Sequence, residues 1–231
     1  MINYDFRGRL QYIPGGALNV QMSAWPAVGG NWWEPTTGSY TVVAAYQAKG
    51  AASLAASYVN LANPGTNDAA PGTAPAFDTS YGWDFNGSTM YLTTGIVPTV
   101  SHTVIVRFSD GNTASNDLFG VQESAGTFFV RPSNGFAQRA YNNAGNRSVS
   151  GAVTSGVIGF AGKNAYLNGS SDGTIGAGTF TWTAAMYLGA RHISGTGPGG
   201  YTNARIQAVA IYSTTLDATQ VAEITTNMAA L

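Results

Sequence analysis

Short runs of β-forming residues, broken every few positions by glycine, proline, asparagine or serine, fill the chain from Thr41 onward. The runs have the length of strands, and Gly and Asn at the breaks permit the positive φ angles of tight turns. Helical periodicity, which βαβ units would require, is convincing only near the C-terminus. The sequence therefore predicts an all-β, two-sheet antiparallel sandwich. The expected strands are Thr41 to Tyr46, Gly82 to Phe85, Thr89 to Thr93, His102 to Phe108, Leu118 to Gln122, Thr127 to Arg131, Phe136 to Tyr141, Ser148 to Val153, Gly156 to Ala161, Asn164 to Leu167, Asp172 to Ile175, Ala184 to Leu188 and Arg205 to Ile211.

Two of these segments carry more specific signals. Asn168-Gly169 lies between two β-type runs and predicts a hairpin from Asn164 to Ile175. Ser170 and Ser171 follow directly, so we expect its loop to be longer than two residues. The run from Arg205 to Tyr212 is largely apolar on both faces, which predicts a strand in the middle of the sandwich.

The C-terminal segment has a different pattern. Asp217, with Gln220 three residues later, can form a capping box. Leu216, Val221, Ile224 and Met228 then follow at helical spacing. We expect a helix from about Asp217 to Ala230 that packs on the sandwich.

The first 39 residues contain three prolines and several glycine pairs, and no periodicity persists among them. They are interpreted as an N-terminal arm that docks on its own domain or on a neighbouring subunit, with the sandwich occupying residues 40 to 231. The alanine-rich segment Ala44 to Ala62 is expected to be a strand followed by an irregular loop, with a helix as the alternative. Trp83 and Trp182, flanked by β-type residues, are assigned to the core or to a half-buried face.

Composition excludes several classes of function. Only 9% of residues are charged, the formal net charge is −1, and the basic residues are scattered singly. Binding to nucleic acid or to an anionic membrane, which requires a basic patch, is therefore not expected. No apolar run is long enough to cross a bilayer, and the first ten residues lack the apolar core of a signal peptide, so we expect a soluble chain not exported through the Sec route. With no cysteine and two histidines, a zinc site or a Ser-His-Asp triad is improbable.

Three motifs in order resemble the laminin-G-like (concanavalin A-like) jelly-roll family over about residues 42 to 231. The first motif is an early apolar strand and an irregular stretch, followed by a turn that contains an aromatic residue and Asn-Gly. The second is an Asn-Gly hairpin followed by an apolar strand that ends in Gly. The third is a last strand that leads into a short helix. The segments are VVAAYQAKGAASLAASYVNLANP, GWDFNGSTMYLTTG, AYLNGSSDGTIG, MYLGAR and RIQAVAIYSTTLDATQVAEI. The chain also resembles jelly-roll proteins encoded by tailed bacteriophages, which implies a location on the virion surface, with an extracellular location as the alternative.

Related folds include glucanases and calcium-binding proteins, so carboxylates that could act in catalysis or bind calcium are candidates for a site. The Glu-x-Asp-x-x-Glu motif of retaining glycosidases with this architecture is absent. A hydrolase using unrelated carboxylates, for example Asp110 with Glu123, is the less favoured reading. Asp110, Asn112 and Asp117 lie on one predicted loop and are weak candidates for calcium ligands, but the acidic residues are too sparse, and no cofactor is expected.

Candidate sugar-binding residues combine aromatic faces with amide and guanidinium donors. The adjacent Trp32 and Trp33 stand out in the arm, although a role in the core or in anchoring the arm is the preferred interpretation of this pair. Predicted loops supply two further groups, although residues of this kind are more often simply part of a solvated loop. The candidates are Trp32, Trp33, Arg139, Tyr141, Asn142, Arg191, His192 and Tyr201.

We therefore expect a non-catalytic, lectin-like virion component of the capsid-decoration or tail-fibre type. Its arm would dock on other virion subunits, its loops would contact cell-surface glycans, and the chain would form a homo-oligomer. Few charges and many Thr, Ser, Asn, Gly and Ala residues make a surface that loses little hydration on packing in an array, where weak contacts add through multivalency. The alternatives are a free carbohydrate-binding module or adhesin domain and, less favoured, a polysaccharide hydrolase.

Overall fold

The computed structural model describes residues 2–4, 10–12, 30–112, 116–135 and 137–231. The chain divides into two compact units, Met1–Gly30 and Asn31–Leu231. In the first unit, β1 (Ile2–Tyr4) pairs antiparallel with β2 (Leu10–Tyr12), although the sequence predicted no regular structure there. The rest of the predicted arm up to residue 29 lies outside the described residues. The second unit begins at Asn31, nine residues before the predicted start of the sandwich.

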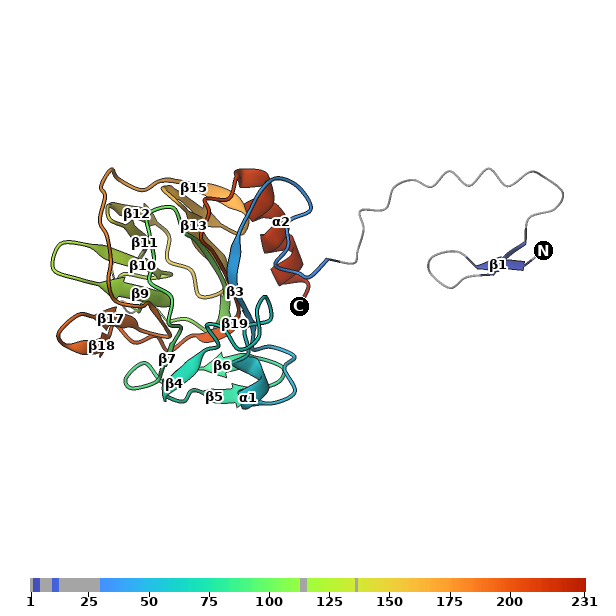
Figure 1. Ribbon diagram of the computed structural model, residues 1–231, viewed down its shortest axis with the longest axis horizontal. Coiled ribbons are helices and arrows are strands. Elements are labelled where there is room, and N and C mark those ends of the chain that lie inside the picture. The colour runs from blue at the N-terminus through green and yellow to red at the C-terminus, as the bar shows by residue number, and fades with distance from the viewer. Residues whose placement is uncertain (1, 5–9, 13–29, 113–115, 136) are drawn as a thin grey trace. The chain divides into compact units, whose positions relative to one another are not determined.

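The described part of the second unit is a two-sheet β-sandwich, as predicted (Figure 1). In the nine-stranded sheet, strands follow the order β12 (Asn146–Ser150), β11 (Gln138–Asn143), β10 (Thr127–Arg131), β9 (Phe119–Gln122), β16 (Tyr187–Leu188), β7 (Tyr91–Thr93) and β4 (Ala70–Thr73). Strand β17 (Arg191–Ile193) also pairs with β9, and β18 (Gly197–Gly199) pairs with β17. In the eight-stranded sheet, the order is β15 (Ser170–Thr174), β14 (Asn164–Leu167), β13 (Gly156–Ala161), β8 (Thr103–Ser109), β19 (Arg205–Tyr212), β6 (Gly82–Asp84) and β5 (Ala76–Asp78), with β3 (Val42–Gln47) also on β19. Strands β4, β5, β17 and β18 were not predicted. All pairs are antiparallel except β17 with β9.

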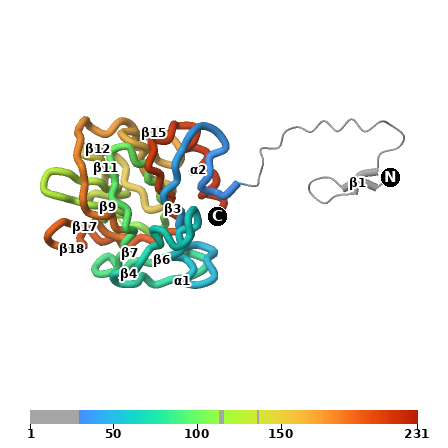
Figure 2. The backbone as a smooth tube through the Cα atoms, in the orientation of Figure 1, coloured from blue at the N-terminus to red at the C-terminus, as the bar shows by residue number. Residues whose placement is uncertain are grey.

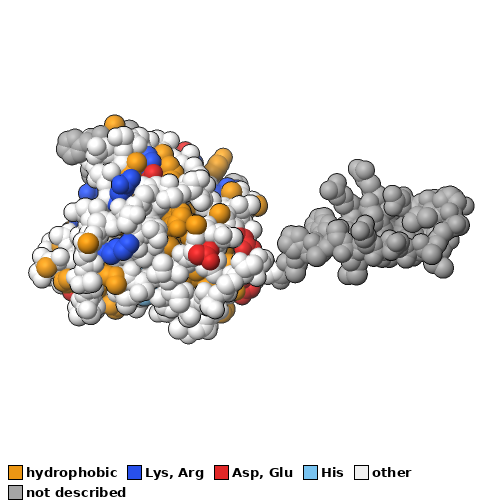
Figure 3. All heavy atoms as spheres, turned by 90° about the horizontal axis from the view of Figure 1, so that it is seen from above, with side chains coloured by type: hydrophobic (Ala, Val, Ile, Leu, Met, Phe, Trp, Pro, Cys, Tyr) orange, Lys and Arg blue, Asp and Glu red, His pale blue; other side chains and the backbone are white. Residues whose placement is uncertain are grey.

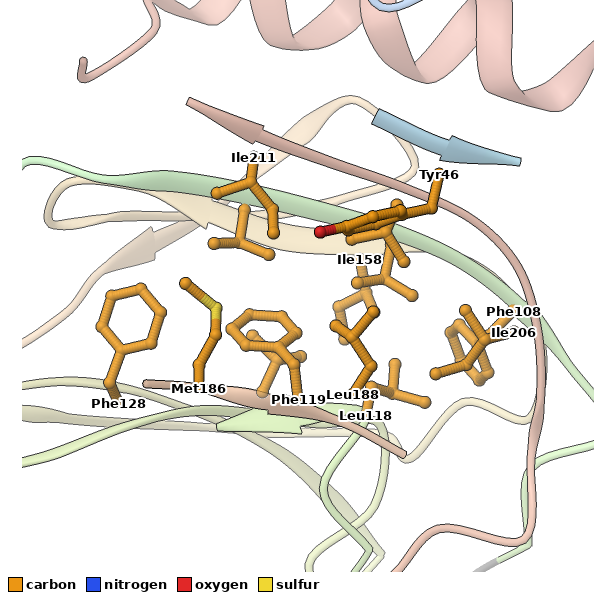
Figure 4. Packing of buried hydrophobic residues seen from close by; sticks show 14 of the residues in the cluster. Tyr46, Phe108, Leu118, Phe119, Phe128, Ile158, Met186, Leu188, Ile206 and Ile211 are labelled. Atoms are coloured by element: carbon orange, nitrogen blue, oxygen red, sulfur yellow. The ribbon is translucent and has the colours of Figure 1, made fainter. Parts of the chain in front are cut away.

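The main core lies between the inner faces of the two sheets (Figure 4). Strand β19 pairs with β3, β6 and β8, so it occupies the central position predicted for it. Its side chains Ile206, Val209 and Ile211 point into this core, while Ala208, Ala210 and Tyr212 face the opposite side. Trp83 and Trp182 are both buried in the core, as expected.

A second core lies on the outer face of the eight-stranded sheet, beneath helix α2 (Ala218–Ala229). Figure 1 shows α2 on the side of the sandwich away from β9 to β12. The helix begins with the predicted capping box, in which Asp217 accepts from the Gln220 backbone and the Gln220 side chain accepts in return. The segment from residue 31 runs beside this helix (Figure 2). Neither described helix could span a bilayer, because α2 has 12 residues and α1 (Leu54–Ser57) has four.

Two local predictions need correction. The loop between β14 and β15 consists of Asn168 and Gly169 alone, both with positive φ (49° and 78°). The predicted longer loop is wrong because Ser170 already pairs with Leu167, and a register shift absorbs the mismatch further along the hairpin. The segment after β3, expected to be an irregular loop, contains the single-turn helix α1, in which Ser53 caps the backbone of Ala56.

Candidate functional site

The predicted sugar-binding residues fall in three separate places. The first holds Trp32 and Trp33, whose rings meet edge to face with centroids 5.3 Å apart. Trp33 is buried in the core beneath α2, and its carbonyl accepts a hydrogen bond from the Tyr212 hydroxyl. The carbonyl of Trp32 accepts from the Asn227 side chain on α2. These contacts make the pair an anchor for the segment before β3, which is the role that the sequence interpretation preferred over sugar binding.

The second place holds Arg139, Tyr141 and Asn142 on β11. Arg139 forms an ion pair with Asp172 on β15, and the Tyr141 hydroxyl donates to the same carboxylate at 2.5 Å. Although burial opposes it, hydrogen bonds from Arg139 and Tyr141 lower the pKa of Asp172. Because β11 and β15 belong to different sheets, this cluster joins the two layers. Asn142 is buried and donates to Asn146 on β12.

The third place brings Arg191, His192 and Tyr201 together with two residues that the sequence interpretation missed, Tyr91 and Tyr187. The Tyr187 and His192 rings are stacked, with centroids 4.4 Å apart and planes inclined by 7°. Tyr91 lies 4.8 Å from Tyr187 and 6.5 Å from Tyr201, measured between ring centroids. Tyr91, Tyr187, His192 and Tyr201 are all partly exposed, and we call this group the tyrosine surface.

The sheet register explains how this surface forms. Tyr187 alternates with Leu188, which is fully buried in the main core, so Tyr187 points outward from the nine-stranded sheet. Tyr91 likewise alternates with the buried Leu92 on the neighbouring strand β7. His192 is held over Tyr187 by its position on β17 and by the 2.9 Å contact of its Nδ1 with the carbonyl of Ala185. Partial burial raises the pKa of the Tyr187 hydroxyl, which therefore stays protonated near neutral pH.

A buried ion cluster adjoins this surface on the same sheet. Asp117 is fully buried and pairs with Arg131 at 2.6 Å and with Arg191 at 3.7 Å. Both guanidinium groups also approach the Phe129 ring, at 4.5 Å and 5.4 Å from its centroid. Glycine at position 120 makes this crowding possible, because a Cβ there would lie 2.9 Å from the Cβ of Phe129 and 3.1 Å from the Cγ of Arg191. The cluster carries two positive charges and one negative charge.

The remaining carboxylates considered for calcium or hydrolysis bind other groups. Asp110 pairs with Arg205 at 2.7 Å, and Asn112 accepts from the Asn116 side chain. Glu123 accepts two backbone hydrogen bonds of 2.7 Å, from Thr183 and Ala184. Burial alone would raise the pKa of the Glu123 carboxyl group, but these hydrogen bonds lower it below its usual value. Within the described ranges, no group of three or more His, Cys, Asp or Glu side chains is placed to hold a metal ion.

The sequence contained a signal for the two missed tyrosines. Tyr187 lies between Met186 and Leu188, and Tyr91 lies between Met90 and Leu92, so each is the polar-tipped member of an alternating run. Alternation placed both rings on one face of their strands. The pairing of β7 with β16, which are far apart in the sequence, could not be read from either run alone.

Comparison with solved structures supports the fold. The chain is similar to domain 4 of AbnA, a GH43 extracellular arabinanase from Geobacillus stearothermophilus, in complex with arabinotriose. That match has a TM-score of 0.56 and 14% identity, and it covers 81% of this chain and 100% of that domain. A Trypanosoma rangeli sialidase is similar at a TM-score of 0.54 and 13% identity over 82% of this chain, but the match spans only 33% of the sialidase. No model of a protein family matches the sequence, and no curated protein is similar to it. At these identities the likeness shows a shared β-sandwich fold.

Proposed function

We propose that this chain is a non-catalytic, lectin-like β-sandwich that binds carbohydrate through the tyrosine surface. The observation that carries the proposal is the continuous run of ring contacts from His192 through Tyr187 and Tyr91 to Tyr201. Helix α2 packs on the other sheet, so this run of rings lies on the side that the helix does not cover (Figure 1).

The chemistry of the surface suits a sugar. Aromatic faces contact the apolar C–H faces of a pyranose or furanose ring, while polar tips and nearby cations bind its hydroxyl groups. Tyr187 and Tyr91 offer both a ring and a hydroxyl, and Arg191 lies directly beside His192 in β17. Because the rings already pack against one another, they lose little side-chain freedom on binding.

The fold comparison is compatible with this proposal. The similar arabinanase domain was solved with a trisaccharide, and the chain covers the whole of that domain. The absence of turnover is part of the proposal and rests on the carboxylates. Asp117 lies buried against arginine, and Asp110 and Glu123 are each bound to a different partner. Most glycosidases use two carboxyl groups facing one another across the scissile bond.

Binding is tested with a glycan array and then by calorimetry with the best glycan. We expect Tyr187→Ala to weaken binding at least tenfold. The matched control is Tyr81→Ala, because Tyr81 is also an exposed tyrosine next to an arginine but is not part of the tyrosine surface. Unchanged binding by Tyr187→Ala, or release of new reducing ends from a bound polysaccharide, would contradict the proposal.

We also propose that the domain acts on a virion surface, with its N-terminal unit attached to another virion subunit. The supporting observations are the division of the chain at Gly30 and the sparse, scattered charges on the face shown in Figure 3. Residues 31–39 contact α2 and strand β19. A deletion that tests attachment should therefore end at Gly30. Loss of incorporation into particles, with glycan binding retained, is the expected result. Normal incorporation of the deleted chain would refute the attachment.

A further inference from the structure

A second pocket lies on the opposite side of the sandwich from the tyrosine surface. It has a volume of about 590 Å³ and is lined by the outer face of β8, β13 and β19 and by the C-terminal half of α2. This volume falls within the range of roughly 300–1,000 Å³ that is usual for small-molecule sites. The polar side chains that line it include Arg107, Ser109, Asn168, Gln207 and Thr225.

Gln207 is the first unusual feature of this pocket. The pairing of β19 with β8 shifts register between Ile206 and Ala208, so Gln207 is the extra residue of a β-bulge. Bulges redirect a side chain out of the regular alternation and are over-represented next to active sites. Gln207 is only 8% exposed, and its side-chain amide makes no hydrogen bond to any described residue. The amide is therefore free to bond a molecule bound in the pocket.

Thr225 adds a second group of the same kind. It lies on the face of α2 that packs toward the sheet and is 7% exposed. Its Oγ1 is buried and lacks a hydrogen-bond partner among the described residues. In helices a threonine hydroxyl commonly bonds the carbonyl one turn earlier, as Thr226 does here with Ala222. Two residues that are more than nine-tenths buried therefore bring unpaired polar groups to one pocket.

Arg107 supplies the charge. Its Nη1 donates to the carbonyls of Met228 and Leu231 at the end of α2, which fixes the guanidinium group beside the pocket. Its Nε and Nη2 make no hydrogen bond within the described part of the chain, so their donors remain for a ligand. The lining residues include no Asp or Glu. Arg107 is therefore the charged side chain of the lining, with hydroxyl and amide groups around it.

We propose that this pocket binds a sugar acid, meaning a small polyol that carries a carboxylate. The carboxylate would accept from the free Nε and Nη2 of Arg107, a geometry that guanidinium groups favour. The ring hydroxyls would bond the Gln207 amide and the Thr225 hydroxyl. The proposal does not depend on the tyrosine surface, because the two sites lie on different sheets.

The test is a ¹H–¹⁵N NMR titration of the full chain with D-glucuronate and with D-glucose, its uncharged counterpart. We expect glucuronate to shift the side-chain signals of Gln207 and Arg107 and to bind at least tenfold more tightly than glucose. Methyl β-D-glucuronoside has a blocked anomeric oxygen, as a glucuronate residue at the end of a polysaccharide has. Tighter binding of this glycoside than of free glucuronate would identify the end of a polysaccharide as the ligand.

Substitutions separate a binding role from a structural one. Gln207→Leu with Thr225→Val should abolish glucuronate binding while leaving the melting temperature unchanged or higher, because neither side chain makes a hydrogen bond that the changes would remove. Thr225→Val alone, which keeps the shape of the side chain, should weaken binding at least threefold. Thr94→Val is the matched control, since the Thr94 hydroxyl is buried but fully paired, and it should lower the melting temperature without affecting binding. Equal affinity for glucose and glucuronate, no shift at Gln207 or Arg107, or a lower melting temperature in the double variant would overturn the proposal.

Discussion

Tyr187 and His192 lie face to face, with ring centroids 4.4 Å apart and planes nearly parallel. They come from strands β16 and β17, which are joined by only two residues, Gly189 and Ala190. The chain therefore reverses sharply at this point, and both strands pair with β9. The stack links the β17–β18 hairpin to the sheet and holds the centre of the tyrosine surface in place.

We predict that His192→Ala lowers the free energy of unfolding by about 0.5–1.5 kcal/mol, which is the usual contribution of an aromatic pair beyond its buried area. Glycan binding should also weaken, because Tyr187 loses the ring that orients it. Urea denaturation and calorimetry measure the two effects. His192→Phe keeps a flat ring and should restore most of the stability; if it behaves like His192→Ala, the stack does not have this role.

We expect the Asp117 cluster to be sensitive to the loss of its closer partner. Arg131→Met should lower the free energy of unfolding by about 3 kcal/mol, because it leaves a fully buried carboxylate with only the more distant Arg191. Arg191→Met should have a smaller effect. Adding Asp117→Asn to Arg131→Met should recover part of the loss, as measured in a double-mutant denaturation cycle. A purely additive result would show that the two residues are not coupled.

Stability should fall in mildly acidic solution because of His102. This side chain is 5% exposed, and its Nδ1 accepts from the backbone N–H of Thr99 at 3.0 Å. Burial lowers the pKa of His102 from 6.5 to about 4. Between these two values the unfolded chain binds a proton that the folded chain does not, so stability is lost as the pH falls from about 6.5 toward 4.

The expected loss from His102 is about 2 kcal/mol between pH 7.5 and pH 5. The measurement is a series of denaturation curves for the wild type and for His102→Gln, which has no proton to bind in this range. The difference between the two proteins isolates the histidine from the carboxylates. A wild-type curve that parallels that of His102→Gln would rule out this contribution.

The capping box of α2 allows a simpler test. Asp217→Ala removes the acceptor for the Gln220 backbone and should lower the free energy of unfolding by about 1 kcal/mol. Asp217→Asn retains an acceptor oxygen and serves as the control. Circular dichroism during thermal unfolding records the change, and an Ala variant as stable as the Asn variant would show that the cap contributes little.

The sequence predicted the sandwich because strand alternation and turn residues are local signals. The ranges Thr127–Arg131, Gly156–Ala161 and Asn164–Leu167 agree with the structure, and the capping box correctly located α2. Strands such as Gly197–Gly199 escaped prediction because they consist of residues with little tendency to form strands. They are strands only because β17 lies beside them, which is a tertiary effect.

The candidate site was predicted in part. His192 and Tyr201, which were grouped because they lie on one short stretch of chain, both belong to the run of ring contacts through Tyr187 and Tyr91. Arg139 and Tyr141 were chosen for their loop-like surroundings, but the two sheets close over them and Asp172 occupies their polar groups. Gln207 was interpreted as one face of a regular strand, because a bulge depends on the register of the neighbouring strand and leaves no mark in a single sequence.

Helix α2 covers the outer face of the eight-stranded sheet and leaves the outer face of the nine-stranded sheet open. Trp32 at one end of the unit and Leu231 at the other both make hydrogen bonds at the helix side of the sandwich. A polypeptide attached through either end of this unit would thus leave the sandwich on the face that α2 covers. The tyrosine surface, on the sheet that α2 does not cover, would then remain accessible to a ligand.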